Sequence, residues 1–207
     1  MDKLAKFWDR IATRYSKQPI ADEASYQKKL EITREYLQPD MKVLEIGCGT
    51  GTTAIIHAPY VKHIHAIDIS SKMIEIAQNK ADAKSIGNIS FEQLKIGELD
   101  VQDQTLDVVL GFSILHLLEN KEEVIAKVYK MLKSGGIFVS STVCLEDSMS
   151  WLKVIAPLGK LLGLMPLVKF FTKEEQEGCL SHAGFDIEYS WLPGKGKAVF
   201  LVARKLG

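Results

Sequence analysis

The sequence predicts an α/β fold in which a doubly wound, mostly parallel sheet carries helices on both faces. Three observations predict it. Strand-like apolar segments alternate with helix-like segments between residues 42 and 142. A glycine-rich loop, within VLEIGCGTG at 43–51, directly follows the first apolar segment. Two apolar segments near the C-terminus are separated only by PGKG, which predicts an antiparallel hairpin added at the sheet edge.

The expected elements alternate in type along the chain. In order they are helices at 3–16 and about 22–37, a strand at 42–46, a helix at about 52–58, a strand at 63–68, a helix at 71–86, strands at 89–94 and 106–112, a helix at 120–132, a strand at 137–142, a helix at 172–184, and strands at 185–192 and 197–205. Helices between successive strands imply right-handed crossovers and a parallel sheet.

Local signals justify the main boundaries. Pro19 separates the first two helices. Ser70 or Ser71 can cap the helix at 71–86, which steps apolar residues round one side. The sequence KSGG at 133–136 predicts a glycine stop after the helix at 120–132. The strand at 106–112 is apolar throughout and is expected to be buried on both faces.

Composition excludes several classes of protein. The 207 residues carry a formal net charge of zero, so no global charge favours nucleic acid or an anionic membrane. The N-terminal segment MDKLAKFWDR lacks the apolar core of a secretory signal, and no apolar run reaches transmembrane length. Three widely spaced cysteines fit reduced thiols better than a disulfide framework. We therefore expect a cytoplasmic protein.

The glycine loop predicts a nucleotide site. In an open α/β sheet, ligands bind beyond the carboxyl ends of the strands. There Gly47, Gly49 and Gly51 permit tight turns and close approach of a ligand. Asp68 ends the second strand, where a carboxylate can accept hydrogen bonds from ribose hydroxyls. Turn glycines and a capping acid would explain each residue separately, but their order favours the nucleotide site.

The spacing indicates which nucleotide binds. A dinucleotide site has the spacing G-x-G-x-x-G, whereas this loop reads G-x-G-x-G and is preceded by Glu45. An acid would repel a pyrophosphate and attract an ammonium group. The ligand should be a nucleoside with a positively charged amino-acid tail, which fits S-adenosylmethionine (SAM).

Four segments resemble successive motifs of the class I SAM-dependent methyltransferases, which have a Rossmann-like fold: VLEIGCGTG, AIDIS with MIEIAQ, LDVVLGFSILHLL and MLKSGGIFVSST. The resemblance covers about residues 40–142, with a looser match in the final hairpin, and is nearest to the small-molecule branch that includes quinone-biosynthesis-like enzymes. The sequence shows no linker that would divide the chain, so one methyltransferase domain over 1–207 is expected. Its parts are a helical lid (1–38), a SAM-binding core (39–142), an apolar helical cover (145–173) and a final helix with the hairpin (174–207).

The resemblance also implies roles for individual residues. Glu45 would hold the amino group of SAM and Asp68 the ribose. Many relatives carry an acid after strand three, where this chain has Lys95, so backbone groups of Lys95 and Ile96 would replace it. The remaining implied cofactor contacts are Gly47, Cys48, Gly49 and Gly51 around the methionine part, Ile69 and Met73 around the adenine, Phe112 and Ser113 near the sulfonium, and Tyr15 as a cap from the lid.

No catalytic residue is identified by this chemistry, because SAM is already activated and a base is needed only for some acceptors. His116 is a weak candidate base, and packing or helix capping is the alternative. Metal binding by the cluster of His57, His63 and His65 is disfavoured because no cysteine or acid joins it at ligand spacing, and no metal is expected. Cys48 is better explained as a small residue in a crowded turn than as a catalytic thiol.

The segment 151–171 is apolar with three lysines, and two prolines break it into short pieces. It is expected to pack over the acceptor pocket, or to contact a membrane peripherally, or both. The sequence thus predicts methyl transfer from SAM, with release of S-adenosylhomocysteine, to a small acceptor that could be lipophilic. A non-catalytic SAM-binding regulator and a nicotinamide-dependent oxidoreductase are the alternatives. Nucleic acid is not expected as a partner, and a monomer and a homodimer both remain open.

Overall fold

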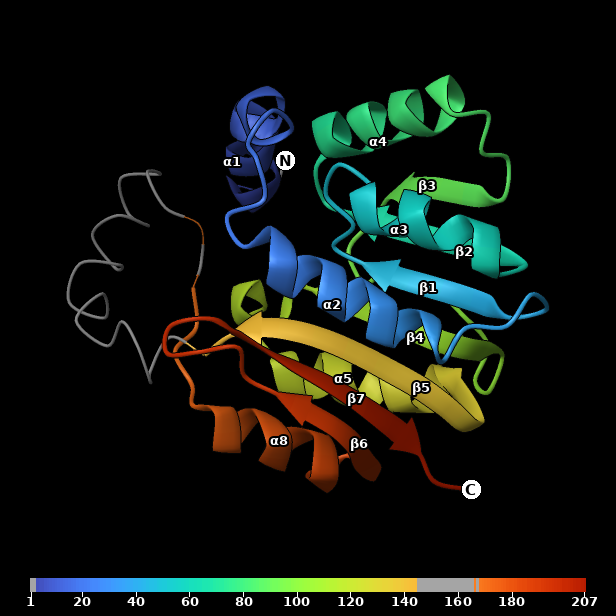
Figure 1. Cartoon of the computed structure of the whole chain (residues 1–207), viewed down its shortest axis with the longest axis vertical. Coiled ribbons are helices and arrows are strands. Elements are labelled where there is room, and N and C mark those ends of the chain that lie inside the picture. The colour runs from blue at the N-terminus through green and yellow to red at the C-terminus, as the bar shows by residue number, and fades with distance from the viewer. Residues whose placement is uncertain (1–2, 145–165, 167) are drawn as a thin grey trace.

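The computed structural model describes residues 3–144, 166 and 168–207. It contains a seven-stranded sheet of order β3-β2-β1-β4-β5-β7-β6, shown in Figure 1. The strands are β1 (Lys42–Ile46), β2 (His63–Asp68), β3 (Ile89–Gln93), β4 (Leu106–Phe112), β5 (Leu132–Val143), β6 (Phe185–Trp191) and β7 (Ala198–Lys205). The α-helices are α1 (Lys3–Tyr15), α2 (Glu23–Arg34), α3 (Thr52–His57), α4 (Ser71–Ala83), α5 (Lys121–Met131) and α8 (Lys173–His182). Two short 3₁₀ helices, η1 (Ala58–Tyr60) and η2 (Leu115–Leu117), follow α3 and β4.

Strand directions confirm the expected class. The five strands β3, β2, β1, β4 and β5 run parallel to their neighbours. Strand β7 pairs antiparallel with both β5 and β6, so the C-terminal hairpin extends the sheet. The second strand of the hairpin, rather than the first, joins the parallel sheet. The order reverses between β1 and β4, which places a topological switch point beside the glycine loop.

The two faces of the sheet bury different residues and carry different helices. Val43 packs in a cluster with residues of α3 and α4, whereas Leu44, the next residue on the strand, packs in a cluster with residues of α5 and α8. In β4, Val108 and Val109 alternate between the same two clusters and both are fully buried. Alternation of side chains along a strand thus produces two apolar layers. Helices on both faces and a doubly buried β4 are confirmed.

The segment after α5 differs from the expectation. The helix ends at Met131, and Leu132 is already extended and paired with Leu106 of β4. The glycines of KSGG lie within β5, where the register shifts and Gly135 has a φ of +77°. They form a bulge in the strand rather than a left-handed cap on the helix. The prediction of a glycine stop was therefore wrong, because strand pairing begins before the glycines.

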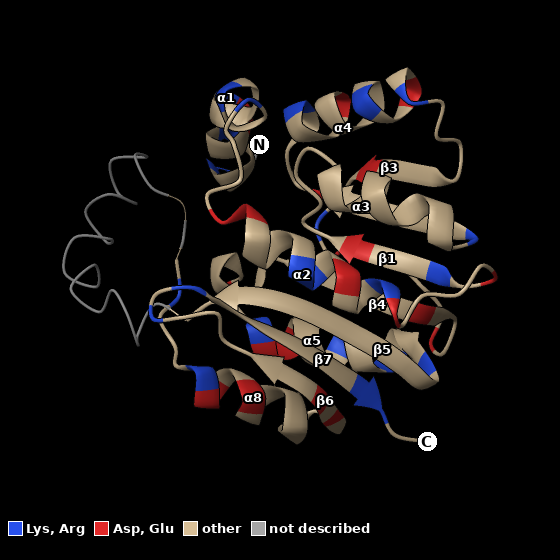
Figure 2. Ribbon diagram, viewed as in Figure 1, with Lys and Arg blue, Asp and Glu red and all other residues tan. Residues whose placement is uncertain are grey.

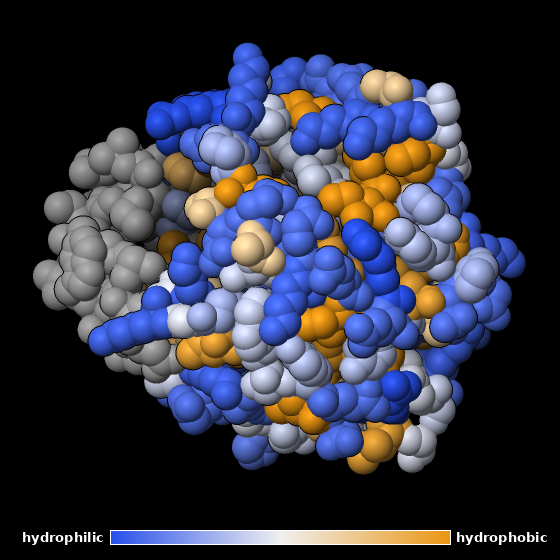
Figure 3. Space-filling model, in the orientation of Figure 1, coloured by the Kyte–Doolittle hydropathy of each residue, from blue (hydrophilic) through white to orange (hydrophobic). Residues whose placement is uncertain are grey.

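Charged residues lie mainly on the helices and at the sheet's ends. In Figure 2 the middle of β5 is uncharged, while α4 carries both signs along its exposed side. The space-filling view in Figure 3 shows this face covered largely by hydrophilic residues. Within the described part of the chain, no helix combines the length and the apolar character that crossing a bilayer requires. The expected cover at 145–173 falls mostly on residues 145–165 and 167, which lie outside the described ranges.

Candidate functional site

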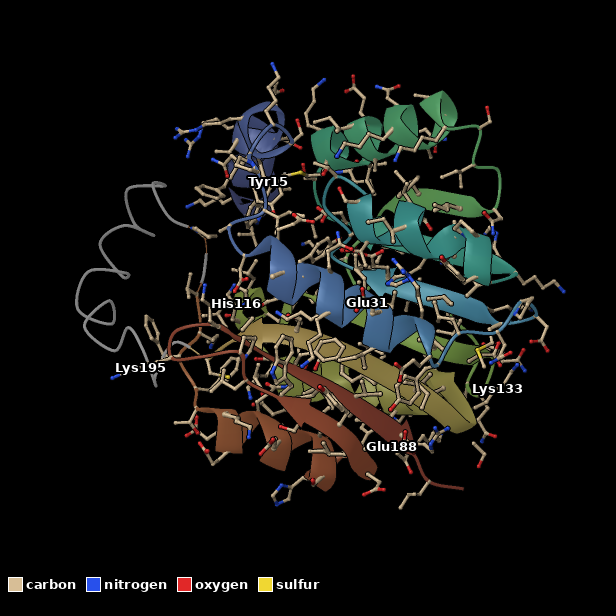
Figure 4. The ribbon with its side chains drawn as sticks, in the orientation of Figure 1. Tyr15, Glu31, His116, Lys133, Glu188 and Lys195 are labelled. Atoms are coloured by element: carbon tan, nitrogen blue, oxygen red, sulfur yellow. The ribbon has the colours of Figure 1, made fainter. Side chains whose placement is uncertain are left out.

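The residues selected from the sequence gather at the carboxyl ends of the parallel strands. Figure 1 shows the arrowheads of β1, β3 and β5 pointing to the side of the sheet on which α1 lies. In Figure 4, Tyr15 and His116 lie on that side, and Lys133 lies at the opposite end of the sheet. Two adjoining cavities occupy this edge and share Tyr15, the glycine loop and the end of β4.

The first cavity, called here the apolar cavity, lies above the ends of β2 and β4. The predicted residues that line it are Tyr15, Gly47, Gly49, Asp68, Ile69, Met73, Ile96, Phe112 and Ser113. Leu4 and Trp8 of α1 add to the apolar wall, as does Leu94. A carboxylate in an otherwise apolar hollow suits a flat apolar ring that carries hydroxyl groups.

The second cavity, called here the polar cavity, lies between α2, the glycine loop and the end of β5. The predicted residues in its wall are Tyr15, Glu45, Gly47, Cys48, Gly49, Phe112 and Ser113. Tyr26 and Lys29 of α2 and Ser141 of β5 also line it. This cavity therefore presents groups of both charges, in contrast to its apolar neighbour.

Asp68 is held in place by the backbone. Its Oδ2 accepts a hydrogen bond of 2.9 Å from the Gly49 N–H, and its Oδ1 accepts one of 2.9 Å from the Ser70 N–H. Burial raises the pKa of Asp68, and these hydrogen bonds act in the opposite direction. The carboxylate is thus fixed between the glycine loop and the start of α4, with its second lone pairs available to a ligand.

Glu45 is a buried carboxyl group with spare hydrogen-bonding capacity. Only 2% of the residue is exposed, and its Oε2 has no hydrogen-bond partner among the described residues. Burial, followed by the charge of Asp68, raises its pKa to about 8. A buried carboxyl oxygen without a partner in the wall of a cavity is a candidate for binding a cationic or hydrogen-bond-donating ligand.

Two glycines of the loop, Gly49 and Gly51, serve different purposes. Gly49 has a φ of +52°, and a Cβ placed on it would meet nothing within 4 Å, so its bare backbone faces open space. Gly51 has a φ of +73°, and its Cβ would lie 2.7 Å from Cβ of Ala77 in α4. Gly51 lines neither cavity and instead allows α4 to pack against the loop. Its expected contact with a ligand is therefore not part of this arrangement.

Ser113 ends β4 in an unusual backbone conformation. Its φ is +57°, and its N–H donates a hydrogen bond of 2.6 Å to the Ser141 carbonyl. Non-glycine residues in the left-handed region cost free energy and gather at functional sites. The turn exposes Ser113 where both cavities meet.

Helix α1 closes the apolar cavity and is tied to α4 by Asp9. The Asp9 Oδ1 accepts hydrogen bonds of 2.7 Å from Ser70 Oγ and of 3.1 Å from the Lys72 N–H. Trp8 packs edge-to-face against Tyr15, with 6.2 Å between ring centroids. The negative charge of Asp9 also interacts favourably with the positive, N-terminal end of the α4 dipole. Tyr15 is 45% exposed and lines both cavities from the end of α1.

Sequence reasoning missed the contribution of α2. Tyr26 and Lys29, three residues apart on that helix, face the polar cavity. Tyr26 Oη lies 3.0 Å from Thr53 Oγ1, and Lys29 Nζ donates a hydrogen bond of 2.9 Å to Ser141 Oγ. Their helical spacing was visible in the sequence, but no local signal shows which face of a helix meets a cavity.

Other predicted residues lie outside both cavities. Lys95 is exposed, and its neighbours Leu94 and Ile96 line the apolar cavity in its place. His116 lines neither cavity, and burial lowers its pKa to about 4. Cys48 does line the polar cavity, but burial raises the pKa of its thiol well above its ordinary value, which disfavours a nucleophilic thiolate.

The histidines of β2 are engaged with neighbouring strand β3. His65 Nε2 lies 2.8 Å from Glu92 Oε2, and His63 Nε2 lies 3.1 Å from Ser90 Oγ. His57 is completely buried in α3, on a different element from these two. Over residues 3–144, 166 and 168–207, no group of three or more histidine, cysteine or acidic side chains has a geometry that could hold a metal ion.

Known proteins share these motifs and this fold. Residues 37–186 match the family model described as a methyltransferase domain. An uncharacterized methyltransferase of Bacillus subtilis, YcgJ, is 30% identical over 98 residues, which is 47% of this chain and 39% of that protein. A demethylmenaquinone methyltransferase of Geobacillus kaustophilus is 24% identical over 202 residues, 92% of this chain and 79% of that protein.

A solved structure extends the likeness to the fold. Phosphoethanolamine N-methyltransferase 2 of Haemonchus contortus, in complex with phosphomonomethylethanolamine and S-adenosylhomocysteine, has a TM-score of 0.72 at 15% identity. The match covers 88% of this chain and 53% of that one. This chain spans 39% of the length of the Bacillus subtilis protein and 44% of that of a phosphoethanolamine N-methyltransferase of Plasmodium falciparum. The family model covers most of the sequence and agrees with the resemblance in the four motifs, so the chain belongs to the methyltransferase domain family.

Proposed function

We propose that this protein is a SAM-dependent methyltransferase that transfers a methyl group to a small acceptor and releases S-adenosylhomocysteine. The observation that carries the proposal is the junction of the two cavities at the glycine loop. One cavity is apolar and contains Asp68, while the other contains the unpartnered carboxyl oxygen of Glu45. The ligand that matches this order of groups has an aromatic base, a ribose and an amino-acid tail.

The residues present fit the parts of SAM in turn. Trp8, Ile69 and Met73 supply apolar surface for the adenine, beside Asp68, which can accept hydrogen bonds from the ribose hydroxyls. The buried Oε2 of Glu45 can accept a hydrogen bond from the ammonium group of the tail. Gly49 offers backbone without a side chain at the point where the two cavities join.

When bound, SAM would supply a methyl group on a sulfonium that an electron-rich atom can displace in line. The chain's own contribution is to hold both reactants in line and to exclude water. Phe112 and Ser113 lie at the junction of the cavities, where the reacting centre would be. Ile114, Leu117 and Leu118 make the adjoining wall apolar, which supports a small, apolar acceptor.

The N-terminal residues 1–38 act in this proposal as a lid over the cofactor. Helix α1 contributes Leu4, Trp8 and Tyr15 to the cavity wall and is fixed to α4 through Asp9. Residues 39–142 form the cofactor-binding core, and the final helix and hairpin complete one methyltransferase domain. We place the protein in the cytoplasm, since its three cysteines are odd in number and far apart in the sequence, a pattern that fits reduced thiols better than a disulfide framework.

His116 remains a candidate base only for acceptors that must lose a proton. Its Nδ1 is buried and has no partner among the described residues, and its pKa of about 4 keeps the ring neutral near pH 7. A neutral imidazole can accept a proton, although its low basicity limits this role. Methyl transfer to an acceptor that is already electron-rich requires no base, and His116 is then a packing residue.

Calorimetric titration of the purified protein tests the function. SAM and S-adenosylhomocysteine are titrated into the wild type and the Asp68→Ala variant, with NAD as the control ligand. Binding of both nucleosides in the micromolar range, lost in the variant and not seen with NAD, supports the proposal. Folded wild-type protein that binds neither nucleoside would refute it, and binding of NAD alone would favour an oxidoreductase. Incubation with methyl-labelled SAM and a panel of apolar acceptors then separates an enzyme from a SAM-binding regulator.

A further inference from the structure

Lys29 is a buried cation that has no carboxylate partner within the described residues. It is 8% exposed, lines the polar cavity and donates its one hydrogen bond among those residues to Ser141 Oγ. Asp22, which attracts its charge from the start of the same helix, is instead paired with Lys197 Nζ at 3.1 Å. Lysine is rarely buried unless it is paired. Its ammonium has three donors, so capacity remains for an anionic ligand.

Glu45 and Lys29 both line the polar cavity. Because Lys29 Nζ is bonded to Ser141 Oγ, the position of Ser141 in the sheet shows where the lysine ammonium lies relative to Glu45. Glu45 pairs with Leu110 of β4, Leu110 pairs with Val139 of β5, and Ser141 lies two residues further along β5. Because alternate residues of a strand point the same way, Glu45 and Ser141 project from the same face of the sheet. One intervening strand and two residues along β5 separate them, which corresponds to about 12 Å between their backbones.

A zwitterion matches these two groups better than a simple anion does. A lone carboxylate or phosphate at Lys29 would leave the carboxyl group of Glu45 without a donor in the same cavity. An α-amino acid places an ammonium and a carboxylate on one carbon. Two charge-assisted hydrogen bonds joined through that carbon span on the order of 8 Å, so one zwitterion can bridge an acidic and a basic group that reach into the cavity from different strands.

We propose that Lys29 Nζ binds the carboxylate of the amino-acid tail of SAM. The hydrogen bond that Lys29 Nζ donates to Ser141 Oγ would hold the lysine side chain in position for this contact. The inference rests on the proposed function and adds the group that makes the polar cavity selective for a zwitterionic tail. The competing anchor is the N-terminal end of α3, whose Thr52 and Thr53 also line the cavity. If the N-terminal end of α3 bound the carboxylate instead, removing the charge of Lys29 would not change the preference for a ligand that carries the carboxylate over one that lacks it.

The test compares SAM with decarboxylated SAM, which retains the sulfonium and the amine. Both ligands are titrated calorimetrically into wild-type protein and into Lys29→Met, which retains the length of the side chain. Wild-type protein should bind SAM at least about tenfold more tightly than the decarboxylated ligand. In Lys29→Met the affinity for SAM should fall roughly 10- to 100-fold. The decarboxylated ligand should keep its wild-type affinity, so the preference should disappear.

Lys28→Met is the matched control. Lys28 is the neighbouring residue on α2, and its Nζ packs over the Trp191 ring at 4.1 Å instead of lining either cavity. This variant should retain the preference of the wild type. Thermal unfolding of all three proteins shows whether each is folded. 5′-Methylthioadenosine, which lacks the whole tail, should bind wild type and Lys29→Met equally.

The outcomes separate the inference from the function on which it rests. If the wild type binds no SAM, the proposed function fails. If it binds SAM but shows no preference over the decarboxylated ligand, only the Lys29 inference is overturned, and this result requires no variant. A preference that persists unchanged in folded Lys29→Met overturns the inference in the same way and favours the N-terminal end of α3.

Discussion

Glu45 and Asp68, near the ends of the neighbouring strands β1 and β2, are two acids on either side of the glycine loop, the first buried and the second half-buried. Burial of Glu45, reinforced by the charge of Asp68, raises the pKa of Glu45 to about 8. An ammonium group placed beside Glu45 would favour its ionised form. The free protein therefore contains a carboxyl group that carries a proton near neutral pH and would lose it when a cationic ligand binds.

The first prediction concerns Glu45→Gln and pH. Glu45 has a pKa of about 8 in the folded protein and an ordinary value of 4.5, so the folded state holds an extra proton between these values. The contribution of Glu45 to the free energy of unfolding should therefore fall as pH rises from about 4.5 to 8. The Gln variant should lose this slope and be more stable at pH 8, by on the order of 1 to a few kcal/mol.

Urea denaturation of wild type and Glu45→Gln at pH 5, 6, 7 and 8 measures this difference. The same variant should bind SAM more weakly, because an amide cannot supply the negative charge for the ammonium. Equal pH slopes in the two proteins would show that Glu45 is ionised in the free protein.

The second prediction separates Asp68 from the rest of the protein. Asp68→Asn should weaken SAM, S-adenosylhomocysteine and 5′-methylthioadenosine alike, by about 10- to 100-fold, because all three carry the ribose. The matched control is Asp107→Asn, since Asp107 is the second residue of β4, at the opposite end of the sheet, and pairs with Lys133 at 2.6 Å. Calorimetry should show unchanged nucleoside affinity in this control. Similar losses in both variants would point to a general loss of structure.

The third prediction concerns the attachment of α1. Asp9→Ala removes the acceptor for Ser70 Oγ and the Lys72 N–H. Loss of such a cap costs about 0.5–2 kcal/mol locally, so α1 should open more often. Amide hydrogen exchange in α1 should become faster, and nucleosides should dissociate faster. Asp82→Ala, at the other end of α4, serves as the control and should leave exchange in α1 unchanged. Wild-type exchange in Asp9→Ala would show that Asp9 does not hold the helix.

The fourth prediction distinguishes two glycines of the loop. Both have positive φ, so alanine at either should cost about 1–2 kcal/mol of stability. Gly51→Ala should cost about 1–3 kcal/mol more, because its Cβ would lie 2.7 Å from Cβ of Ala77. Gly49→Ala should mainly weaken SAM binding, since its Cβ points into open space beside the cavities. Thermal unfolding and calorimetry on both variants check this division, which equal stabilities would contradict.

The fifth prediction concerns the completely buried His57. Burial lowers its pKa from 6.5 to about 4, so the folded state binds fewer protons than the unfolded state in that window. Its contribution to stability is present above pH 6.5 and should be lost as pH falls towards 4. His57→Leu should therefore lose less stability than wild type between pH 7 and 5.

The His57 and Glu45 contributions have opposite signs where their windows overlap. Urea denaturation in a Glu45→Gln background isolates the histidine. His116 has a similarly lowered pKa, so His116→Leu in the same background serves for comparison. A His57→Leu profile that parallels the background protein would show that His57 can be protonated without unfolding.

Several parts of the fold could be predicted from local sequence. Apolar patterning identified the strands. Of the two candidate caps of α4, Ser70 and Ser71, Ser70 takes the role and accepts a hydrogen bond from the Met73 N–H. KSGG was misread because strand pairing between Leu132 and Leu106, which are distant in sequence, overrides the local preference of glycine for a helix end. The place of Lys95 after β3 predicted that its backbone would contact the cofactor. Which residues of that loop face the cavity depends on tertiary packing, which places Leu94 and Ile96 there and leaves Lys95 exposed.

The sequence by itself determined the order of elements, the family and the loop between Glu45 and Asp68, because periodicity, turn chemistry and motif spacing are local properties. Tertiary structure decided which side chains share a cavity. It brought Lys29 of α2 beside Ser141 of β5, residues separated by more than a hundred positions, and placed Gly51 in a packing contact with α4. Such relationships follow from the burial of whole faces of helices and sheets, which no short stretch of sequence specifies.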